Sequence, residues 1–599
     1  MPILSNARAV LKSVFGYEDF RPGQAEVISA ILSGGPVLAV MPTGSGKSMC
    51  YQLPALLDGG LTLVVSPLIA LMRDQVQQMR AVGVAAGSLN SNNSAEETED
   101  TWRQIRAGDL RLLFVSPERL ALDGLTSALS RREVRRVAVD EAHCVSEWGH
   151  DFRPEYRKIK RAIEALGRPQ AIAFTATADQ ATRADIVERL FTSPPQIFLH
   201  SFDRPNIDLR FEAKDQPRRQ LTEFLSRRRG QSGIIYCASR KKTEGLAEYL
   251  AGQGHETVAY HAGLDLTARN RNQDRFLRED GVVAVATVAF GMGVNKPDVR
   301  FVAHADMPSS VEAYYQEIGR AGRDGLNAET LTLYGVEDIA LRRRQIDEKN
   351  IDDAQRLVER RRLGALTGLC EAARCRRQIL LAYFDEPSDP CGRCDVCRGQ
   401  VALYDGTIDA QKALSAVART GQRFGAGYLA SLLVGEATEP MQRNRHQELK
   451  TFGVGKGRSK HEWTAIYRQL FACDALEAAS EEHGGFQLTG KGEAILLGRE
   501  AISLRSPEKA TRKRERISGS RTRISNDADD DLIAKLKTLR RELARDEGVP
   551  AFMVFPDKTL LDMAERRPTT LDEMSEVHGV GQRKLTLYGK AFLDVVRNS

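Results

Sequence analysis

Short and almost entirely apolar runs alternate with helix-length segments through the first 340 residues of the chain. Near-continuous hydrophobicity over four to eight residues is typical of parallel strands that are buried on both faces. The runs lie at 36–41, 61–67, 111–117, 135–143 and 171–178, and then at 232–239, 257–262, 282–290 and 300–308. The pattern therefore predicts two α/β domains, joined near residues 203–206.

The hydrophobic pattern changes beyond residue 340. From Arg342 to Phe384 it is helical and rich in arginine, and a cluster of cysteines follows. Residues 405–500 predict a small α+β domain, with helices near 409–420, 427–435 and 459–475 and a hairpin that turns near 483–485. The stretch 506–526 has seven basic and two acidic residues and no apolar periodicity, which indicates a linker. The last segment, 527–599, is predicted to be helical.

These changes divide the chain into six parts. Each boundary lies where one hydrophobic pattern gives way to the next. We place the parts at 1–205, 206–340, 341–403, 404–505, 506–526 and 527–599.

Composition narrows the class of protein. Of 599 residues, 42% are hydrophobic and 28% are charged, which is the profile of a folded chain. No apolar run approaches the roughly 18 residues of a membrane helix, and the N-terminus lacks the features of a secretory signal. We therefore expect a cytosolic protein without a membrane partner. The net charge of +6, from 86 basic and 80 acidic residues, is too small to indicate a polyanionic partner by itself.

The segment MPTGSGKS (41–48) directly follows a predicted strand and precedes a predicted helix. Gly44 and Gly46 would let backbone amides converge on phosphate oxygens at a helix N-terminus. Lys47 is expected at the β- and γ-phosphates of ATP, and the Ser48 hydroxyl on Mg²⁺. The strict phosphate-loop pattern has glycine where Met41 stands, so the match is imperfect. The candidate nucleotide-binding residues of this segment are Thr43, Gly44, Ser45, Gly46, Lys47 and Ser48.

Two further segments supply the charges that phosphoryl transfer needs. Asp140 and Glu141 end a buried strand, where Asp140 would hold Mg²⁺ and Glu141 would act as general base on the attacking water. Arg320 and Arg323 lie three residues apart, and we predict that they share one helical face directed across an inter-domain cleft toward the γ-phosphate. Either pair alone is more often a solvated surface feature. Their occurrence with the phosphate loop favours the catalytic interpretation.

Five of the nine cysteines fall between positions 370 and 397. Cys375, Cys391, Cys394 and Cys397 have the spacing of a tetrahedral four-thiolate zinc site, and a four-cysteine iron–sulfur cluster is the alternative. The segment 370–384 is predicted to be helical, so that Cys370 would be rotated by about 140° from Cys375 at ~100° per residue. Only one of these two can therefore face the metal.

The segment that follows Glu141 is unusually aromatic. Trp148, His150, Phe152 and Arg153 lie in a stretch of thirteen residues, in a chain of which only 6% is aromatic. Aromatic rings and guanidinium groups stack on unpaired bases, which is how proteins hold single strands without sequence preference. A minor core is the alternative, because Trp148 and Phe152 are four residues apart.

Together these segments resemble the RecQ family of superfamily-two helicases. The other matching segments occur in family order: FGYEDFRPGQ (15–24), SPLIALMRDQ (66–75), SPERL (116–120), FTATA (174–178), IIYCASR (234–240), YHAGL (260–264) and ATVAFGMGVNKPDVR (286–300). The resemblance implies two tandem RecA-like lobes, a helical zinc-binding subdomain, a winged helix and a small all-α HRDC-like domain. It also implies an ATP- and Mg²⁺-dependent DNA helicase that moves 3′→5′ and unwinds forked or branched duplexes in recombination and repair.

The resemblance also assigns roles to individual residues. It selects Cys375, rather than Cys370, as the first zinc ligand, and it indicates that the aromatic segment couples bound single-stranded DNA to hydrolysis. It places Gln24 on the edge of the adenine. The remaining residues that it brings to the nucleotide site are Tyr17, Arg21 and Gln316.

The domain 527–599 is expected to tune the choice of DNA. Its turn 579–584 could present Lys584 to a phosphate, although twelve basic against fourteen acidic residues make the domain slightly acidic. A protein-contacting role remains the alternative. As further partners we expect a single-strand-binding protein at the winged helix, and we expect a monomer that is cytoplasmic and nucleoid-associated.

Two other functions remain open from the sequence. An RNA helicase shares the phosphate site, and no motor motif by itself distinguishes the sugar. A zinc and winged-helix module that uses ATP only to regulate binding is the second alternative.

Overall fold

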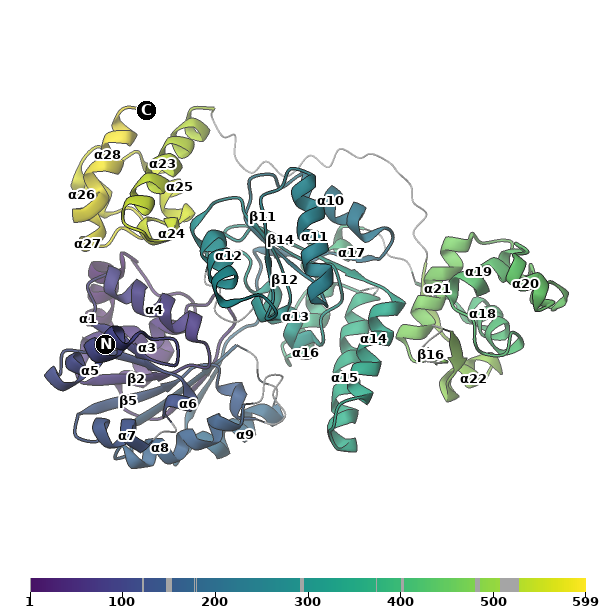
Figure 1. The fold of residues 1–599 in the computed structure, drawn as a ribbon, viewed down its shortest axis with the longest axis horizontal. Helices are drawn as coiled ribbons and strands as arrows, with labels where there is room; N and C mark the ends of the chain where they lie inside the picture. Colours follow the sequence, from purple (N-terminus) through teal and green to yellow (C-terminus); the bar gives the residue numbers. More distant parts are fainter. Residues whose placement is uncertain are drawn as a thin grey trace.

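The computed structural model describes residues 2–120, 123–146, 153–176, 178, 180–290, 296–372, 374–399, 403–479, 485–506 and 527–599. Among these residues, no helix is both long and apolar enough to cross a membrane. Figure 1 shows the two α/β lobes side by side, with the winged helix at one end of the molecule and the C-terminal helices at the other.

The first lobe is built on a parallel sheet of seven described strands in the order β3-β4-β2-β5-β6-β1-β7. The strands are β1 (Val37–Val40), β2 (Leu61–Val65), β3 (Ala86–Leu89), β4 (Leu112–Val115), β5 (Val134–Val139), β6 (Gln170–Thr175) and β7 (Gln196–Leu199). Since β6 lies between β1 and β5, the loops that follow these strands meet at one edge of the sheet, where α/β proteins bind ligands.

Helices cover both faces of this sheet. They are α1 (Pro2–Val10), α2 (Gln24–Leu32), α3 (Lys47–Leu57), α4 (Ile69–Ala81), α5 (Ala95–Ala107), α6 (Pro117–Leu120), α7 (Asp123–Leu129), α8 (Ile159–Ala165) and α9 (Gln180–Leu190). The strands β1, β2 and β4 are completely buried, which explains why they could be predicted from apolar runs alone.

The second lobe has a parallel sheet in the order β11-β12-β10-β13-β14-β8, with β9 also paired to β14. Its strands are β8 (Ile207–Asp208), β9 (Phe211–Ala213), β10 (Gly233–Tyr236), β11 (Thr257–Tyr260), β12 (Val283–Ala286), β13 (Phe301–His304) and β14 (Ala328–Tyr334). Its helices are α10 (Pro217–Ser226), α11 (Arg240–Gly252), α12 (Leu266–Arg278) and α13 (Val311–Ile318). The prediction of two RecA-like lobes is confirmed.

Four helices follow the second lobe: α14 (Val336–Asp347), α15 (Asp353–Cys370), α16 (Arg376–Tyr383) and α17 (Asp395–Arg398). The prediction of a continuous helix over 370–384 is wrong. The chain leaves the helix after Cys370, and Cys375 is the N-cap of α16 with φ −47° and ψ 122°. The break frees the Cys375 thiol from the helical register, so that it reaches the other cysteines.

The next domain packs on these helices through α21. Arg343 of α14 donates to the backbone oxygens of Phe471 and Leu476, at 3.0 and 3.3 Å. The elements of the domain are β15 (Leu403–Asp405), α18 (Thr407–Arg419), α19 (Ala426–Val434), α20 (Glu439–Arg443), α21 (Lys460–Ala472), β16 (Leu476–Ala478), β17 (Phe486–Leu488), α22 (Gly490–Leu496) and β18 (Ser503–Arg505). The predicted hairpin is present as the antiparallel pair β16 and β17, and its turn lies outside the described residues.

The C-terminal domain is helical and encloses its own apolar core around Leu532, Phe555 and Phe592. Its helices are α23 (Asp527–Asp546), α24 (Ala551–Val554), α25 (Asp557–Arg566), α26 (Leu571–Ser575), α27 (Gln582–Lys584) and α28 (Lys590–Arg597). The domain contacts both lobes. The Gly579 amide donates to the Gly16 oxygen of lobe 1 at 2.8 Å, and Arg540 lies 3.4 Å from Asp280 of lobe 2.

Candidate nucleotide site and zinc centre

The phosphate loop connects β1 to α3 at the ligand-binding edge of the first sheet. Gly44 and Gly46 have φ of +86° and +82°, a conformation that side chains rarely adopt. A Cβ atom at Gly44 would come within 2.8 Å of the Arg204 guanidinium, and one at Gly46 within 2.5 Å of the Gln24 amide. The backbone conformation therefore favours glycine at both positions, as a phosphate cradle needs, and two polar side chains lie close against them.

Lys47 and the acidic pair lie together at this edge. The Lys47 ammonium donates to the Met41 oxygen at 3.2 Å. Burial lowers the pKa of Lys47, while the Glu141 and Asp140 carboxylates oppose this shift. Burial and the neighbouring Glu141 raise the pKa of Asp140 to about 7. This buried, mixed-charge arrangement is suited to a ligand that carries both phosphate and a divalent cation.

Glu141 adopts an unusual backbone conformation, with φ +48° and ψ +48°. A non-glycine residue in this region stores strain of order 1 kcal/mol, and such strain is concentrated at functional sites. Its carboxylate lies 3.4 Å from Nδ1 of His143, which contacts the Thr175 hydroxyl at 3.0 Å. The general-base candidate is thus oriented by the end of β6, the strand between the two nucleotide-binding loops.

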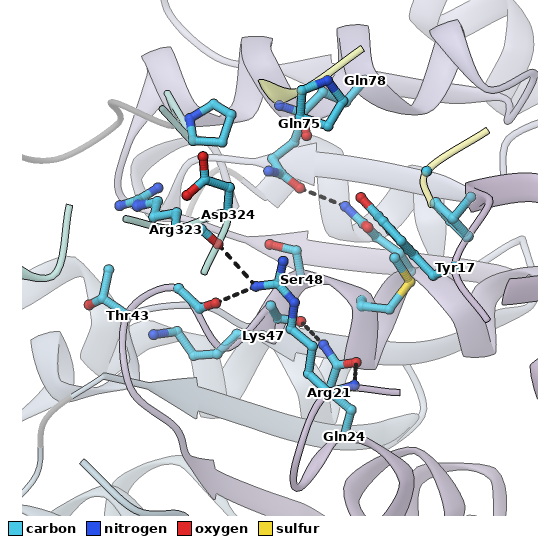
Figure 2. Close-up of a pocket in the computed structure, with 18 of the residues that line it drawn as sticks. Tyr17, Arg21, Gln24, Thr43, Lys47, Ser48, Gln75, Gln78, Arg323 and Asp324 are labelled. Carbon is cyan, nitrogen blue, oxygen red and sulfur yellow. Dashed lines mark hydrogen bonds between the residues drawn. The ribbon is translucent and has the colours of Figure 1, made fainter. Parts of the chain in front are cut away.

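Arg21 and Gln24 contact the phosphate loop directly (Figure 2). The Gln24 side-chain amide donates to the Ser45 and Gly46 oxygens at 3.0 and 3.1 Å, and its oxygen accepts from the Arg21 amide at 2.9 Å. Arg21 donates to the Gly44 oxygen and, at 3.4 Å, to the Arg323 oxygen of lobe 2. The predicted adenine-binding residues therefore lie beside the phosphate loop, and their contact with a base stays a prediction.

Arg320 and Arg323 do not share a helical face as predicted. Helix α13 ends at Ile318, and both arginines lie on the turn that follows, in which Gly322 has φ +57°. The Gly322 amide donates to the Val299 oxygen, which holds the turn against the segment that precedes β13. We call residues 319–325 the arginine turn. Gly319 directly before Arg320 and Gly322 between the two arginines favour a turn, and this is the physical reason for the error.

Both arginines nevertheless face the nucleotide-binding loops. They line one cavity of about 650 Å³ together with Gln316, Lys47 and Glu141. Burial, with Arg320 and Arg204 close by, lowers the pKa of Arg323 to about 9. Within the described part of the chain, the buried Nε atom of Arg320 has no hydrogen-bond partner. Concentrated positive charge with an unsatisfied donor is the arrangement expected of a site that binds a polyphosphate.

A third wall of the same cavity comes from the C-terminal domain. Phe552, His578 and Lys584 line it, and the His578 ring lies 5.4 Å from the ring of Tyr17. Burial lowers the pKa of Lys584 to about 8. The Gly579 amide is already bonded to Gly16, so it is not directed at a phosphate. The sequence shows no pattern that predicts this docking, because the domain is separated from the lobes by the linker.

The four predicted zinc ligands converge. The sulfur atoms of Cys375, Cys391, Cys394 and Cys397 all lie within 4.8 Å of one another, with Cys375–Cys394 at 3.9 Å and Cys391–Cys397 at 4.0 Å. Zn–S bonds of about 2.3 Å in a tetrahedron require sulfur separations of roughly 3.8 Å. Cys370 is buried in the core and is not part of the cluster. The geometry fits zinc with no open coordination position.

Backbone amides support the thiolates. Burial alone would raise the pKa of Cys375, but hydrogen bonds from the amides of Cys391 and Gln378 lower it to about 7. Arg376 pairs with Asp395 at 3.0 Å, and Asp395 accepts from the Phe211 amide of β9 at 3.0 Å. The metal loop is thus attached to the edge of the second lobe.

The predicted DNA-binding segment is only partly described. Trp148, His150 and Phe152 lie outside the described residues. Arg153 donates to the Pro67 oxygen at 3.2 Å, and its amide donates to Cys144 at 2.9 Å. Pro67 belongs to the matching segment 66–75, so Arg153 lies against that segment. Lys584 lies in the cavity described above, and its predicted contact with DNA phosphate remains untested.

Comparison with known families agrees with this architecture. Five family patterns match successive parts of the chain: DEAD/DEAH box helicase over 21–186, helicase conserved C-terminal domain over 216–325, RecQ zinc-binding over 336–398, RQC domain over 400–513 and HRDC domain over 529–596. The first two patterns, on paired lobes with a shared phosphate site, define an ATP-driven helicase motor.

Curated relatives extend the similarity to the whole chain. ATP-dependent DNA helicase RecQ of Haemophilus influenzae is 44% identical over 593 residues, covering 99% of this chain and 96% of that protein. The Bacillus subtilis protein of the same name is 35% identical, covering 99% of both chains. RecQ-like DNA helicase BLM of Xenopus laevis is 32% identical over 97% of this chain and 46% of its own length. The chain belongs to the RecQ family of ATP-dependent DNA helicases, and its cofactors include ATP and zinc.

Proposed function

We propose that this helicase moves 3′→5′ on single-stranded DNA and unwinds forked or branched duplexes, in recombination and repair, with Mg²⁺ as the ATP-bound cation. The observation that carries the mechanism is that the phosphate loop of lobe 1 and the arginine turn of lobe 2 line one cavity. Hydrolysis then requires both lobes, so that the chemical step is coupled to their relative motion. The polarity is supported by family membership alone.

The residues that line the cavity have separate roles in phosphoryl transfer. Lys47 binds the β- and γ-phosphates, and Glu141 accepts a proton from the attacking water. Arg323 and Arg320 stabilise charge that develops on the γ-phosphate, with Arg323 as the finger and Gln316 beside them. Ser48 and Asp140 would hold Mg²⁺, which supplies charge neutralisation at the phosphates when it is bound.

The predicted base contacts complete the site. Tyr17 and Arg21 would stack on the adenine and Gln24 would bond its edge, after releasing the carbonyl oxygens of Ser45 and Gly46. Thr43, Gly44, Ser45 and Gly46 would present backbone groups to the phosphates.

The DNA path is proposed to follow the aromatic segment of lobe 1. Trp148, His150, Phe152 and Arg153 would stack on single-stranded bases. The winged helix would meet the duplex and a single-strand-binding protein. The domain division given above, a monomeric state and a cytoplasmic, nucleoid-associated location belong to the same proposal.

Strand displacement on matched substrates tests this function. DNA duplexes with 3′ tails, 5′ tails and forks are compared with RNA forks of the same sequence, with and without Mg²⁺. We expect unwinding of 3′-tailed and forked DNA only, and only with Mg²⁺. Equal unwinding of RNA would favour the RNA-helicase alternative, and DNA-stimulated hydrolysis without strand separation would favour the regulated binding module.

A further inference from the structure

The guanidinium of Arg204 lies between the two lobes, at the junction of their chains. On one side, Nη1 donates to the Thr43 oxygen of the phosphate loop. On the other side, it donates to three backbone oxygens of the arginine turn. These are Gly319 at 3.3 Å, Ala321 at 2.9 Å and Gly322 at 3.0 Å. One side chain thus contacts both halves of the catalytic machinery.

The packing around these contacts is close. A Cβ atom at Gly319 would come within 2.9 Å of the Thr43 side chain, so the arginine turn lies directly on the phosphate loop. Gly44 in turn leaves space for the Arg204 guanidinium, which a Cβ would approach to 2.8 Å. The planar guanidinium offers five N–H donors in a fixed fork, which matches a ring of carbonyl acceptors on two sides. A lysine ammonium could not span them with the same geometry.

Asn206 provides a comparison within the same segment. Its side-chain amide donates to the Gly322 and Leu326 oxygens, both at 2.9 Å, and so supports the same turn. These partners all belong to lobe 2. The Asn206 side-chain oxygen also accepts from Nε of Arg204 at 3.4 Å, so the two side chains support the turn together. Arg204 in addition bonds to the Thr43 oxygen of the phosphate loop, and this bond is what the comparison tests.

We propose that Arg204 is a positioning residue for hydrolysis, which fixes the arginine turn against the phosphate loop so that Arg323 faces the γ-phosphate. This inference rests on the proposed role of Arg323 and extends it to the inter-lobe segment. Because Arg204 binds backbone oxygens, its effect on the reaction passes through the placement of other groups. A misplacement of about 1 Å at a reacting centre costs on the order of 10²-fold in rate.

The test uses the full-length protein with Arg204→Ala, Arg204→Lys and Asn206→Ala. Three quantities are measured: DNA-stimulated kcat, affinity for a fluorescent ADP, and trapping of ADP with aluminium fluoride, which mimics the transition state. For Arg204→Ala we expect kcat to fall by about 10²-fold, with matching loss of trapping and with ADP affinity within about threefold of the parent. Arg204→Lys should retain only slightly more kcat than Arg204→Ala. Asn206→Ala should lose much less kcat than Arg204→Ala.

A double-mutant cycle with Arg323→Ala distinguishes this inference from the function on which it rests. If Arg204 acts through Arg323, the double variant loses no more kcat than Arg323→Ala alone. Additive losses, an unchanged kcat in Arg204→Ala, or an equal loss in Asn206→Ala would overturn the positioning role while leaving the finger in place. A normal kcat in Arg323→Ala would instead refute the finger itself, whatever Arg204→Ala does.

Discussion

Lys47 is the cation of the phosphate loop and lies within reach of the acidic pair. Lys47→Ala should lower ATP hydrolysis by about 100-fold or more, because among the described residues of lobe 1 no other lysine lines the cavity. Single-strand binding should persist, since the residues proposed to hold DNA belong to another segment of the sequence. The measurements are DNA-stimulated ATPase activity and fluorescence anisotropy with a labelled oligonucleotide. An equal loss of DNA binding would mean that the loop contacts nucleic acid.

Glu141 is the proposed general base and follows the end of β5. Glu141→Gln preserves volume but removes the proton acceptor, so the variant should bind ATP normally and stall before hydrolysis. The two measurements are the rate of single-turnover ATP hydrolysis and the equilibrium affinity for ATP. A substitution at the exposed Glu133, which precedes the same strand, is the control and should have no effect.

Arg323 is expected to act mainly on the transition state. Arg323→Ala should lower kcat by on the order of 10³-fold while changing ATP affinity little. Steady-state kinetics and equilibrium nucleotide binding separate the two effects. A large fall in affinity with normal kcat would assign the arginine to ground-state binding.

At the scale of elements, most strands that could be predicted from apolar runs are buried over most of their length, although the half-buried β11 was also predicted and the largely buried β14 was not. The edge strand β7 is largely exposed, so its sequence QIFL gives only a weak apolar run, and it was missed. In β3, the sequence AGSL lacks β-branched residues, and this strand was missed as well. The chemistry of the loops was predictable from residue type, but their shape was not, as the arginine turn and the break before Cys375 show.

The zinc loop joins α16 and α17 to the edge of lobe 2. Cys394→Ser should give metal-deficient, poorly soluble protein, because loss of a ligand removes the energy that folds small metal modules. Elemental analysis measures the metal content of the variant, and the midpoint of thermal unfolding measures its loss of stability. The same analysis separates zinc from an iron–sulfur cluster, which would also be coloured.

Cys370 offers a matched control within the same helical region. From the sequence, Cys370→Ser is expected to be nearly silent, and the structure places this thiol outside the metal cluster. Because Cys370 is fully buried, an unpaired hydroxyl there costs about 1–3 kcal/mol, so Cys370→Ala is the better control. Both variants should keep full zinc content. Normal zinc in Cys394→Ser, or its loss in Cys370→Ala, would refute the ligand assignment.

At the scale of the whole molecule, the order of domains followed from the sequence, but their contacts did not. Apolar periodicity describes a domain's own core, and an interface such as Arg540–Asp280 consists of polar residues that resemble any solvated surface. Figure 1 shows the C-terminal helices beside the two lobes. That residues of this domain line the nucleotide cavity followed only from the three-dimensional structure. This docked position leads us to expect that the C-terminal domain influences the affinity for ATP.

Truncation after Asn526 should leave kcat for ATP and unwinding of simple forks nearly intact, since Lys47, Glu141 and Arg323 all belong to the two lobes. It should weaken binding to single-stranded or branched DNA modestly, because the domain is slightly acidic and adds little electrostatic affinity. The new expectation concerns nucleotide affinity. Removing His578 and Lys584 opens one wall of the cavity, so the KM for ATP should rise by about two- to fivefold.

Asp280→Arg tests the docked position in the full-length chain. It reverses the charge that Arg540 contacts and leaves every residue of the cavity unchanged, so it should raise the KM for ATP as the truncation does, with kcat preserved. Glu279→Arg is the matched control, because Glu279 pairs with Arg275 of lobe 2 and not with the C-terminal domain. Identical KM values for the parent, the truncation and Asp280→Arg would show that docking does not influence the nucleotide. A truncated protein that is folded and zinc-loaded but unwinds no fork would show that the domain is part of the motor itself.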